Sequence, residues 1–225
     1  MMLQGWMRGA DRSRNADFLT TGPDAAQEVT GVTTGLTEGT RVATAVGWQR
    51  IETIRAGDAV LTFDNGLQTV RAVYADPLWS GSHDCPDRFC PLHVPAGAIG
   101  NSDELLALPQ QGVMVESDVS EAQYGDPFAL MPVHLLDGIC GIERVLPDTP
   151  VAVYMLQFDN DEILFAASGA MCVCPAAGDM VHRAFDEAPA YRLLSGETDG
   201  AMIENIRDEL VTQWHRRLAS RRAES

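Results

Sequence analysis

Two histidines and two cysteines lie within eleven residues of the sequence, in the stretch "HDCPDRFCPLH". The four side chains are His83, Cys85, Cys90 and His93. Two thiolates and two imidazoles form a tetrahedral zinc set, and a Cys-x4-Cys spacing is within the range that zinc ligands use. The alternative is a proline-containing loop with two partly buried thiols and two exposed histidines. Zinc is therefore the one cofactor that the sequence suggests, and both interpretations stay open.

The other cysteines have no spacing that suggests chemistry. Cys172 and Cys174 are too close together for a disulfide, and strand alternation would place both thiols on one face as core residues. Five cysteines, an odd number with irregular spacing, argue against a disulfide scaffold. We therefore expect a reduced, cytoplasmic location by default, while export without a cleaved signal peptide stays open.

Short apolar runs, separated by glycine and proline, predict a mainly-β domain over about residues 35–178. "RVATAVGWQRIETI" contains two runs around a Val-Gly turn, and "AVLTFDNGLQTVRAVY" predicts a hairpin that turns at Asp64-Asn65-Gly66. "PVAVYMLQFDNDEILFAA" repeats this pattern and predicts a second hairpin at Asp159-Asn160-Asp161. Residues 1–34 show no sustained apolar period and are predicted to be a flexible N-terminal lead.

The C-terminal extension, residues 179–225, is predicted to contain an amphipathic helix over about residues 199–222. Its apolar residues fall at steps of three or four: Ile203, Ile206, Leu210, Trp214 and Leu218. Thr198 or Asp199 is a candidate N-cap. The stripe is expected to pack on the β-domain, and the alternative is a helix that binds a second copy or an unknown protein partner.

The charge balance excludes several classes of partner. The chain has 16 arginines, no lysine and 32 acidic residues, which gives a formal net charge of −16. Such a chain repels phosphate backbones and anionic lipid surfaces, so we expect no nucleic-acid binding and no membrane association. No apolar run approaches the ~18 residues of a membrane-spanning helix.

The stretch "GTRVATAVGWQRIETIRAGDAVLTFDNG" resembles the first block of the Hint domain, the fold shared by hedgehog autoprocessing domains and inteins. The likeness is greatest to bacterial hedgehog/intein-type proteins. "PLHVPAGAIGNSDELLALPQQGVMVE" is similar to a second block of that family, and "YMLQFDNDEILFA" to its last hairpin. The resemblance covers about residues 35–178. It implies a mainly-β Hint fold of short strands and hairpins, to which this chain adds a C-terminal α-helix.

The resemblance also implies a self-processing reaction and the residues that should perform it. In the family, a cysteine attacks the carbonyl of the preceding residue, and a Thr/Ser-x-x-His segment polarises the bond and protonates the departing nitrogen. Here the cysteine position is Gly35, and the hydroxyl and histidine positions are Leu108 and Gln111. The histidines of the family hairpin align with Met155 and Asp161. A glutamine cannot shuttle a proton, so the catalytic groups of the family are missing.

Two functional hypotheses follow. The first is a catalytically inactive Hint-type module that works by binding or as a structural unit. The second is an autoprocessing protein that cleaves near Thr34–Leu36 through Thr34 or Thr37 as substitute nucleophile. Thr37 lies on a family threonine position and suits a strand, which favours the first hypothesis. His134 lies among apolar neighbours and is predicted to be a bonded core or turn residue, not a displaced catalyst.

Overall fold

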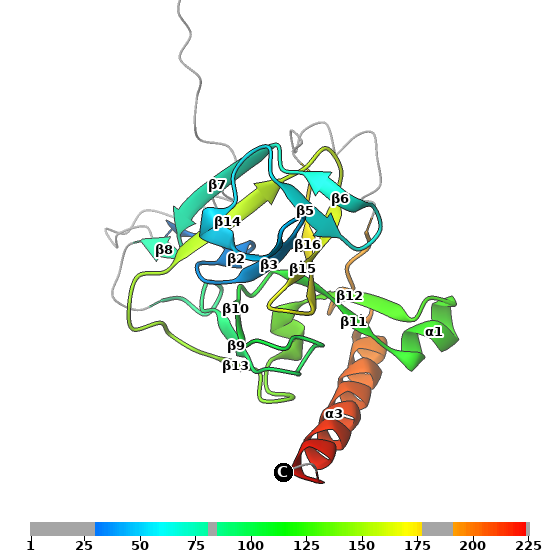
Figure 1. Ribbon diagram of the computed structural model, residues 1–225. Coiled ribbons are helices and arrows are strands. Elements are labelled where there is room, and N and C mark those ends of the chain that lie inside the picture. The colour runs from blue at the N-terminus through cyan, green and yellow to red at the C-terminus, as the bar shows by residue number, and fades with distance from the viewer. Residues whose placement is uncertain (1–29, 81–84, 177–190, 224–225) are drawn as a thin grey trace, which may run out of the picture.

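The computed structural model describes residues 30–80, 85–176 and 191–223 (Figure 1). These residues form a β-domain with the long helix α3 (Gly200–Ala223) lying along one side of it. Among the described residues, no helix combines the length and the apolar character that a membrane span requires.

One sheet contains the strand that follows Gly35 near the start of the domain. Its six strands are, in spatial order, β13 (Glu143–Arg144), β9 (Leu92–Val94), β10 (Leu105–Ala107), β2 (Leu36–Thr37), β14 (Ala152–Gln157) and β7 (Ala72–Pro77). All of these pairings are antiparallel. The short strand β2 lies between β10 and β14, so two segments that are distant in sequence enclose the residues just before it.

The second sheet has eight strands. Seven follow the order β12 (Phe128–Pro132), β11 (Gly112–Glu116), β16 (Ala170–Cys174), β15 (Glu162–Ala166), β3 (Arg41–Thr44), β5 (Ala59–Thr62) and β6 (Gly66–Thr69). The eighth, β4 (Gly47–Arg50), pairs with β3. A separate pair joins β1 (Thr30–Gly31) to β8 (Trp79–Ser80). The core between these layers includes the fully buried side chains of Ile51, Leu92, Met131, Leu156 and Phe158.

The first two predicted turns are confirmed. β3 and β4 form a hairpin around Val46, with Gly47 at φ +104°, and β5 and β6 form a hairpin with Gly66 at φ +67°. Glycine suits both positions because residues with a side chain rarely adopt positive φ. The predicted core role of Cys172 and Cys174 is also confirmed, since both side chains are buried.

The hairpin predicted at Asp159-Asn160-Asp161 is wrong. A turn does connect β14 to β15 there, but the two strands belong to different sheets: β14 pairs with β2 and β7, whereas β15 pairs with β16, β3 and β5. The buried ring of Phe158 lies at the point where the chain passes from one sheet to the other. Periodicity shows that a strand exists, but it does not show which strand it pairs with.

Short helices interrupt the strands at points that the sequence analysis did not identify. They are the 3-10 helices η1 (Ile51–Thr53) and η2 (Val133–Leu136) and the α-helix α1 (Asp118–Tyr124). In α1, the N-cap hydroxyl of Ser117 accepts the N–H of Ser120 at 3.2 Å, and Gly125 ends the helix at φ +75°. Ser117 followed by the acidic Asp118 and Glu121 of the first turn is an N-cap signal that local inspection could have found.

The C-terminal helix is confirmed, and its apolar stripe packs on the β-domain. Met202, Ile203, Ile206 and Leu210 are buried in the main core, and Trp214 packs against it. The carboxylate of Asp199 accepts the N–H of Ser195 at 2.9 Å, and so it closes the preceding turn.

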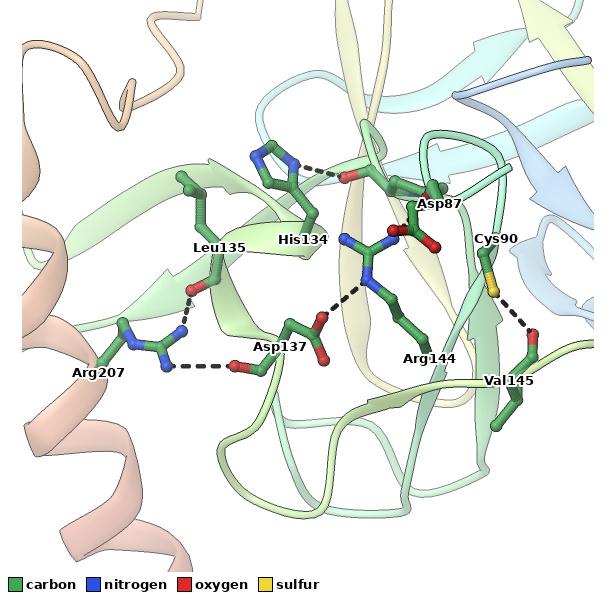
Figure 2. Close-up of polar contacts among 9 residues, drawn as sticks. Asp87, Cys90, His134, Leu135, Asp137, Arg144, Val145 and Arg207 are labelled. Carbon is green, nitrogen blue, oxygen red and sulfur yellow. Dashed lines mark hydrogen bonds and ion pairs between the residues drawn. The ribbon is translucent and has the colours of Figure 1, made fainter. Parts of the chain in front are cut away.

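Polar contacts fix the position of α3 along the domain. The guanidinium of Arg207 donates to the carbonyl of Leu135 in η2 and to that of Asp137, the residue after η2, as Figure 2 shows. Near the other end of the helix, Arg217 donates to the carbonyl of Gly97 at 2.9 Å. The apolar stripe and these arginines together make α3 an integral part of the domain.

Residues 30–34 of the predicted N-terminal lead are held by the domain. The N–H of Val32 donates to the carbonyl of Leu78 at 3.0 Å, and the carbonyl of Thr33 accepts the N–H of Gln110 at 2.9 Å. Residues 1–29 of the predicted lead lie outside the described residues.

Candidate functional site

Strand pairing brings the residues at the family's reaction positions together around Gly35. Leu36, the next residue, lies opposite Ala107 on β10 and opposite Tyr154 on β14. Leu108 directly follows β10, and Met155 lies on β14. The fold therefore preserves the arrangement that the resemblance implies, although the side chains differ.

Gly35 occupies a position where a side chain would not fit. Its φ is +121°, which residues other than glycine rarely adopt. A Cβ atom placed there would lie 2.7 Å from Cγ1 of Val153, 3.0 Å from the carbonyl oxygen of Tyr154 and 3.2 Å from Cγ of Met155. Atoms of β14 therefore fill the space that a side chain at residue 35 would need.

The side chain of Gln111 holds the peptide nitrogen of Gly35. Its Oε1 accepts the N–H of Gly35 at 2.9 Å and lies 3.3 Å from the hydroxyl of Thr34. Its Nε2 donates to the carbonyls of Gly112 and Val173, both at 2.9 Å. The amide orientation follows from its surroundings, because one end faces donors and the other faces two acceptors. Gln111 is buried, and both ends of its amide are hydrogen-bonded.

The direction of these hydrogen bonds matters for the chemistry of the Thr34–Gly35 bond. A departing amide nitrogen must receive a proton from a donor. Here the nitrogen of Gly35 faces an acceptor oxygen, and the two N–H groups of Gln111 are directed to other carbonyls. The amide of Gln111 therefore presents an acceptor, and no donor, to the nitrogen of Gly35.

The family's hydroxyl position has become part of an apolar cluster. Leu108 is fully buried and packs with Leu78 and Val153. Val153 is also the residue nearest to the missing side chain of Gly35. The sequence analysis did not single out Val153, although two-residue alternation with Met155 could have placed both on the same face of β14.

The hydroxyls of Thr34 and Thr37 are engaged in structural hydrogen bonds. Thr34 donates to Oε1 of Gln111, as above, and is half-buried. Thr37 is buried, donates to the carbonyl of Leu106 at 2.8 Å and lies 3.3 Å from the hydroxyl of Thr40. Within the part of the chain that the structure describes, neither hydroxyl is hydrogen-bonded to a carboxylate or an imidazole that could remove its proton.

Asp161 and His134 both make hydrogen bonds to backbone groups. Asp161, at a family histidine position, follows β14 and accepts the N–H of Ala176 at 2.8 Å. His134 lies in η2, and its Nδ1 contacts the carbonyl of Pro109 at 2.9 Å (Figure 2). The prediction that His134 is a bonded turn residue is confirmed.

The predicted zinc residues are only partly within the described chain, since His83 lies outside it. The thiol of Cys85 donates to the carbonyl of Pro86 at 3.6 Å. The thiol of Cys90 donates to the carbonyl of Val145, also at 3.6 Å (Figure 2). Nε2 of His93 lies 3.1 Å from a carboxylate oxygen of Glu104.

The environment of the two thiols favours their neutral form. Burial, with contributions from Cys90 and Asp87, raises the pKa of Cys85 to about 11, and burial also raises the pKa of Cys90. Zinc binds the thiolate. Within the described ranges, no three histidine, cysteine or acidic side chains lie close enough to hold a metal ion. The four-residue zinc set stays a prediction.

Comparisons with known proteins identify the family. A model of the Hint domain matches residues 34–172, which is more than half of the chain. The protein belongs to the Hint-domain family, and its mainly-β architecture is a Hint fold. A search of curated protein sequences found no match.

Similar solved structures are intein domains. A bacterial intein-like domain from Clostridium thermocellum is 17% identical, with 63% of this chain and 99% of that chain covered and a TM-score of 0.44. A splice-inactive variant of the AceL NrdHF class 3 split intein is 15% identical, with 64% and 99% covered and a TM-score of 0.39. The gp41-1 intein is 13% identical, with 61% and 96% covered and a TM-score of 0.36.

Proposed function

We propose that this protein is a Hint domain that does not cleave or splice its own chain and that acts as a binding or structural module. The observation that carries the proposal is the closed position at Gly35. Val153 and Met155 fill the space of the family nucleophile, and Gln111 holds the N–H of the bond that would break. If only the nucleophile had been lost, the space for its side chain would remain open. In this protein, atoms of β14 fill that space.

The buried polar groups around the position also support a structural role. Thr37, Thr40 and Gln111 are buried, and their side-chain polar atoms are hydrogen-bonded. A catalytic centre commonly keeps titratable groups with shifted pKa values. Here neutral hydroxyls and one amide occupy the place of such groups, and they tie β2 to its neighbours.

The test is the intact mass of the freshly purified full-length protein, measured after incubation with and without a thiol or hydroxylamine. We expect the full 24.4 kDa mass under all conditions. A fragment that begins between residues 34 and 37 would overturn the proposal. In that event Thr34→Ala and Thr37→Ala, compared individually, would show which hydroxyl acts.

A second variant tests the closed position directly. Gly35→Cys supplies the missing thiol, yet we expect no thioester and no hydroxylamine-induced fragment, because β14 occupies the space of the side chain. The same assay applied to Gly47→Cys, where nothing lies within 4 Å of the added Cβ, controls for an added exposed thiol. Fragmentation of Gly35→Cys alone would show that the position can still open.

A further inference from the structure

Apolar side chains stay exposed on one face of the eight-stranded sheet, on β5, β6, β12 and β15 and in the turn after β5. We call this group the aromatic face, and it consists of Leu61, Phe63, Leu67, Phe128 and Phe165. Leu61 is 38% exposed, Phe63 37% and Leu67 53%, while the two other rings are half-buried. These are large apolar side chains in contact with solvent, and exposed apolar patches of this kind mark interaction sites.

The aromatic face is continuous across strands that are distant in sequence. Leu61 on β5 lies directly opposite Leu67 on β6. The ring of Phe63 contacts the ring of Phe128 edge-on, with centroids 5.2 Å apart, and lies 6.3 Å from that of Phe165. Three segments thus present one apolar surface, while the alternate residues Val60 and Thr62 point into the core.

The aromatic face reaches an edge of the sheet. Among the strands in the described ranges, β6 pairs with β5 alone. Both the N–H and the carbonyl of Val70, just after β6, bond toward the β5 side, to Asp58 and Gly57. Because backbone groups alternate along a strand, those of Leu67 and Thr69 point outward. An exposed edge of this kind is a template for the addition of another strand.

Acidic side chains border the aromatic face. Asp64 follows Phe63, and the carboxylate of Asp126 accepts the N–H of Phe128 at 2.9 Å. Glu116 lies directly opposite Phe128 in the pairing of β11 with β12 and is exposed. A second copy of this chain would bring another molecule of net charge −16, without a single lysine, to this border. The charges therefore favour a partner that carries basic residues.

From these features we infer that the aromatic face and the β6 edge bind an extended segment of another protein. The segment adds as a strand beside β6, places apolar side chains on the aromatic face and flanks them with lysine or arginine. This inference rests on the proposed binding function and names the chemistry of the partner. Backbone hydrogen bonds to β6 supply part of the affinity, and the apolar contacts and flanking charges supply the selectivity.

The test uses a fluorescently labelled peptide, Lys-Lys-Leu-Thr-Phe-Thr-Leu-Lys-Lys, and the full-length protein. Fluorescence anisotropy should show saturable binding that weakens by about tenfold in the Leu67→Ser variant. Thr69→Pro should weaken binding similarly, because it removes an outward N–H and leaves the apolar side chains in place. The matched control is Val46→Ser, which removes a 79% exposed apolar side chain from a different turn of the same sheet and should change affinity by less than about twofold.

Two further peptides separate charge from apolar contact. A version with glutamate at all four lysine positions should bind at least about tenfold more weakly at low salt, and so should one with serine at the three apolar positions. Circular dichroism checks that each protein variant is folded. Equal binding of the serine peptide, or equal binding by Leu67→Ser and wild type, would overturn the inference by showing nonspecific attraction to an acidic protein.

Analytical ultracentrifugation tests whether a second copy of this chain, instead of another protein, occupies the aromatic face. We expect the protein to stay monomeric over the concentrations used, and a concentration-dependent dimer that Leu67→Ser abolishes would assign the face to a second copy and overturn the inference. The outcome is separate from that of the intact-mass assay. An uncleaved protein that fails to bind the peptide contradicts only this inference, whereas a cleaved protein contradicts the proposed lack of self-cleavage.

Discussion

At the scale of single residues, the site differs from a reaction centre in the groups that surround one peptide bond. Gly35 has no room for a side chain, and the nitrogen of the bond faces the acceptor oxygen of Gln111. Leu108 adds apolar packing where the family has a hydroxyl. All three residues, Gly35, Gln111 and Leu108, contribute contacts around the Thr34–Gly35 bond as it stands in the folded chain.

We predict that Gly35→Ala lowers the free energy of unfolding by about 3 kcal/mol. Overpacking against β14 and a positive φ each cost about 1–3 kcal/mol, and the two costs add. Gly47→Ala is the matched control, since Gly47 has a φ of +104° but nothing within 4 Å of the added Cβ. Chemical denaturation of both variants isolates the contribution of the contacts. Equal losses of stability would show that β14 yields to the added methyl group.

A second prediction concerns the direction of the hydrogen bonds at Gln111. Gln111→Glu keeps an acceptor for Gly35 but turns a carboxylate oxygen toward the carbonyls of Gly112 and Val173, so it should cost about 1–3 kcal/mol near neutral pH. Protonation would restore a donor, and the loss should shrink as the pH falls. The control is Gln110→Glu at an exposed neighbour, which should have little effect on denaturation midpoints. A loss independent of pH would contradict the assigned amide orientation.

At the scale of elements, α3 is joined to the β-domain by both apolar and polar contacts. Its carboxylate Glu209 accepts the hydroxyl of Ser117 at 2.6 Å and the N–H of Asp118 at 2.8 Å, at the start of α1. On the same helix, Arg207 donates to the carbonyl of Asp137 and Arg217 donates to the carbonyl of Gly97. The C-terminal extension therefore stabilises the start of α1 and the loops that contain Gly97 and Asp137.

The Glu209 contact predicts a dependence of stability on pH. Burial alone would raise the pKa of Glu209, but the hydrogen bonds from Ser117, Asp118 and Val119 outweigh it and lower the pKa below its ordinary value of 4.5. A lowered pKa in the folded state stabilises the protein above pH 4.5, and this contribution is lost as the pH falls through the folded value.

The measurement is thermal denaturation of Glu209→Gln and wild type between pH 7 and pH 3. The variant should be less stable at neutral pH, and the difference should close below about pH 4.5. Asp208→Asn, on the exposed side of the same helical turn, is the control and should show no such convergence. A constant difference between Glu209→Gln and wild type would contradict a role for the ionised carboxylate.

At the scale of the whole molecule, the excess of acidic residues affects both folding and association. The formal net charge of −16 leaves many carboxylates without a basic partner. Mutual repulsion of like charges destabilises a compact state and opposes self-association. In the proposed binding mode, the same charge would attract basic segments of other proteins to the aromatic face.

This repulsion predicts that added sodium chloride stabilises the protein. Raising the ionic strength from about 0.01 M to about 0.15 M shortens the Debye length from about 30 Å to about 8 Å. We expect Tm to rise by about 2–4 °C, which corresponds to about 1 kcal/mol for a chain of this size. Differential scanning calorimetry measures the shift, and a fall in Tm would show that attractive ion pairs dominate.

Much of the local structure could be predicted from sequence periodicity and turn chemistry. The alternation around Leu61 and Phe63, together with Gly66, predicted the β5–β6 hairpin, and the stripe from Ile203 to Trp214 predicted α3. The missing nucleophile at Gly35 could also be identified, because the blocks around it resemble a known family. These features depend on residues that are near one another in the chain.

The pairing of distant segments was decided only in the tertiary structure. No local pattern shows that β14 leaves β15 to pair with β2 and β7, or that Val153 and Met155 then fill the space beside Gly35. The sequence by itself determined the β5–β6 hairpin, α3 and the residue types at the positions that the resemblance assigns to catalysis, because these depend on local backbone preference and side-chain chemistry. The tertiary structure decided that the empty position is closed, because that depends on which distant strands bury their side chains together.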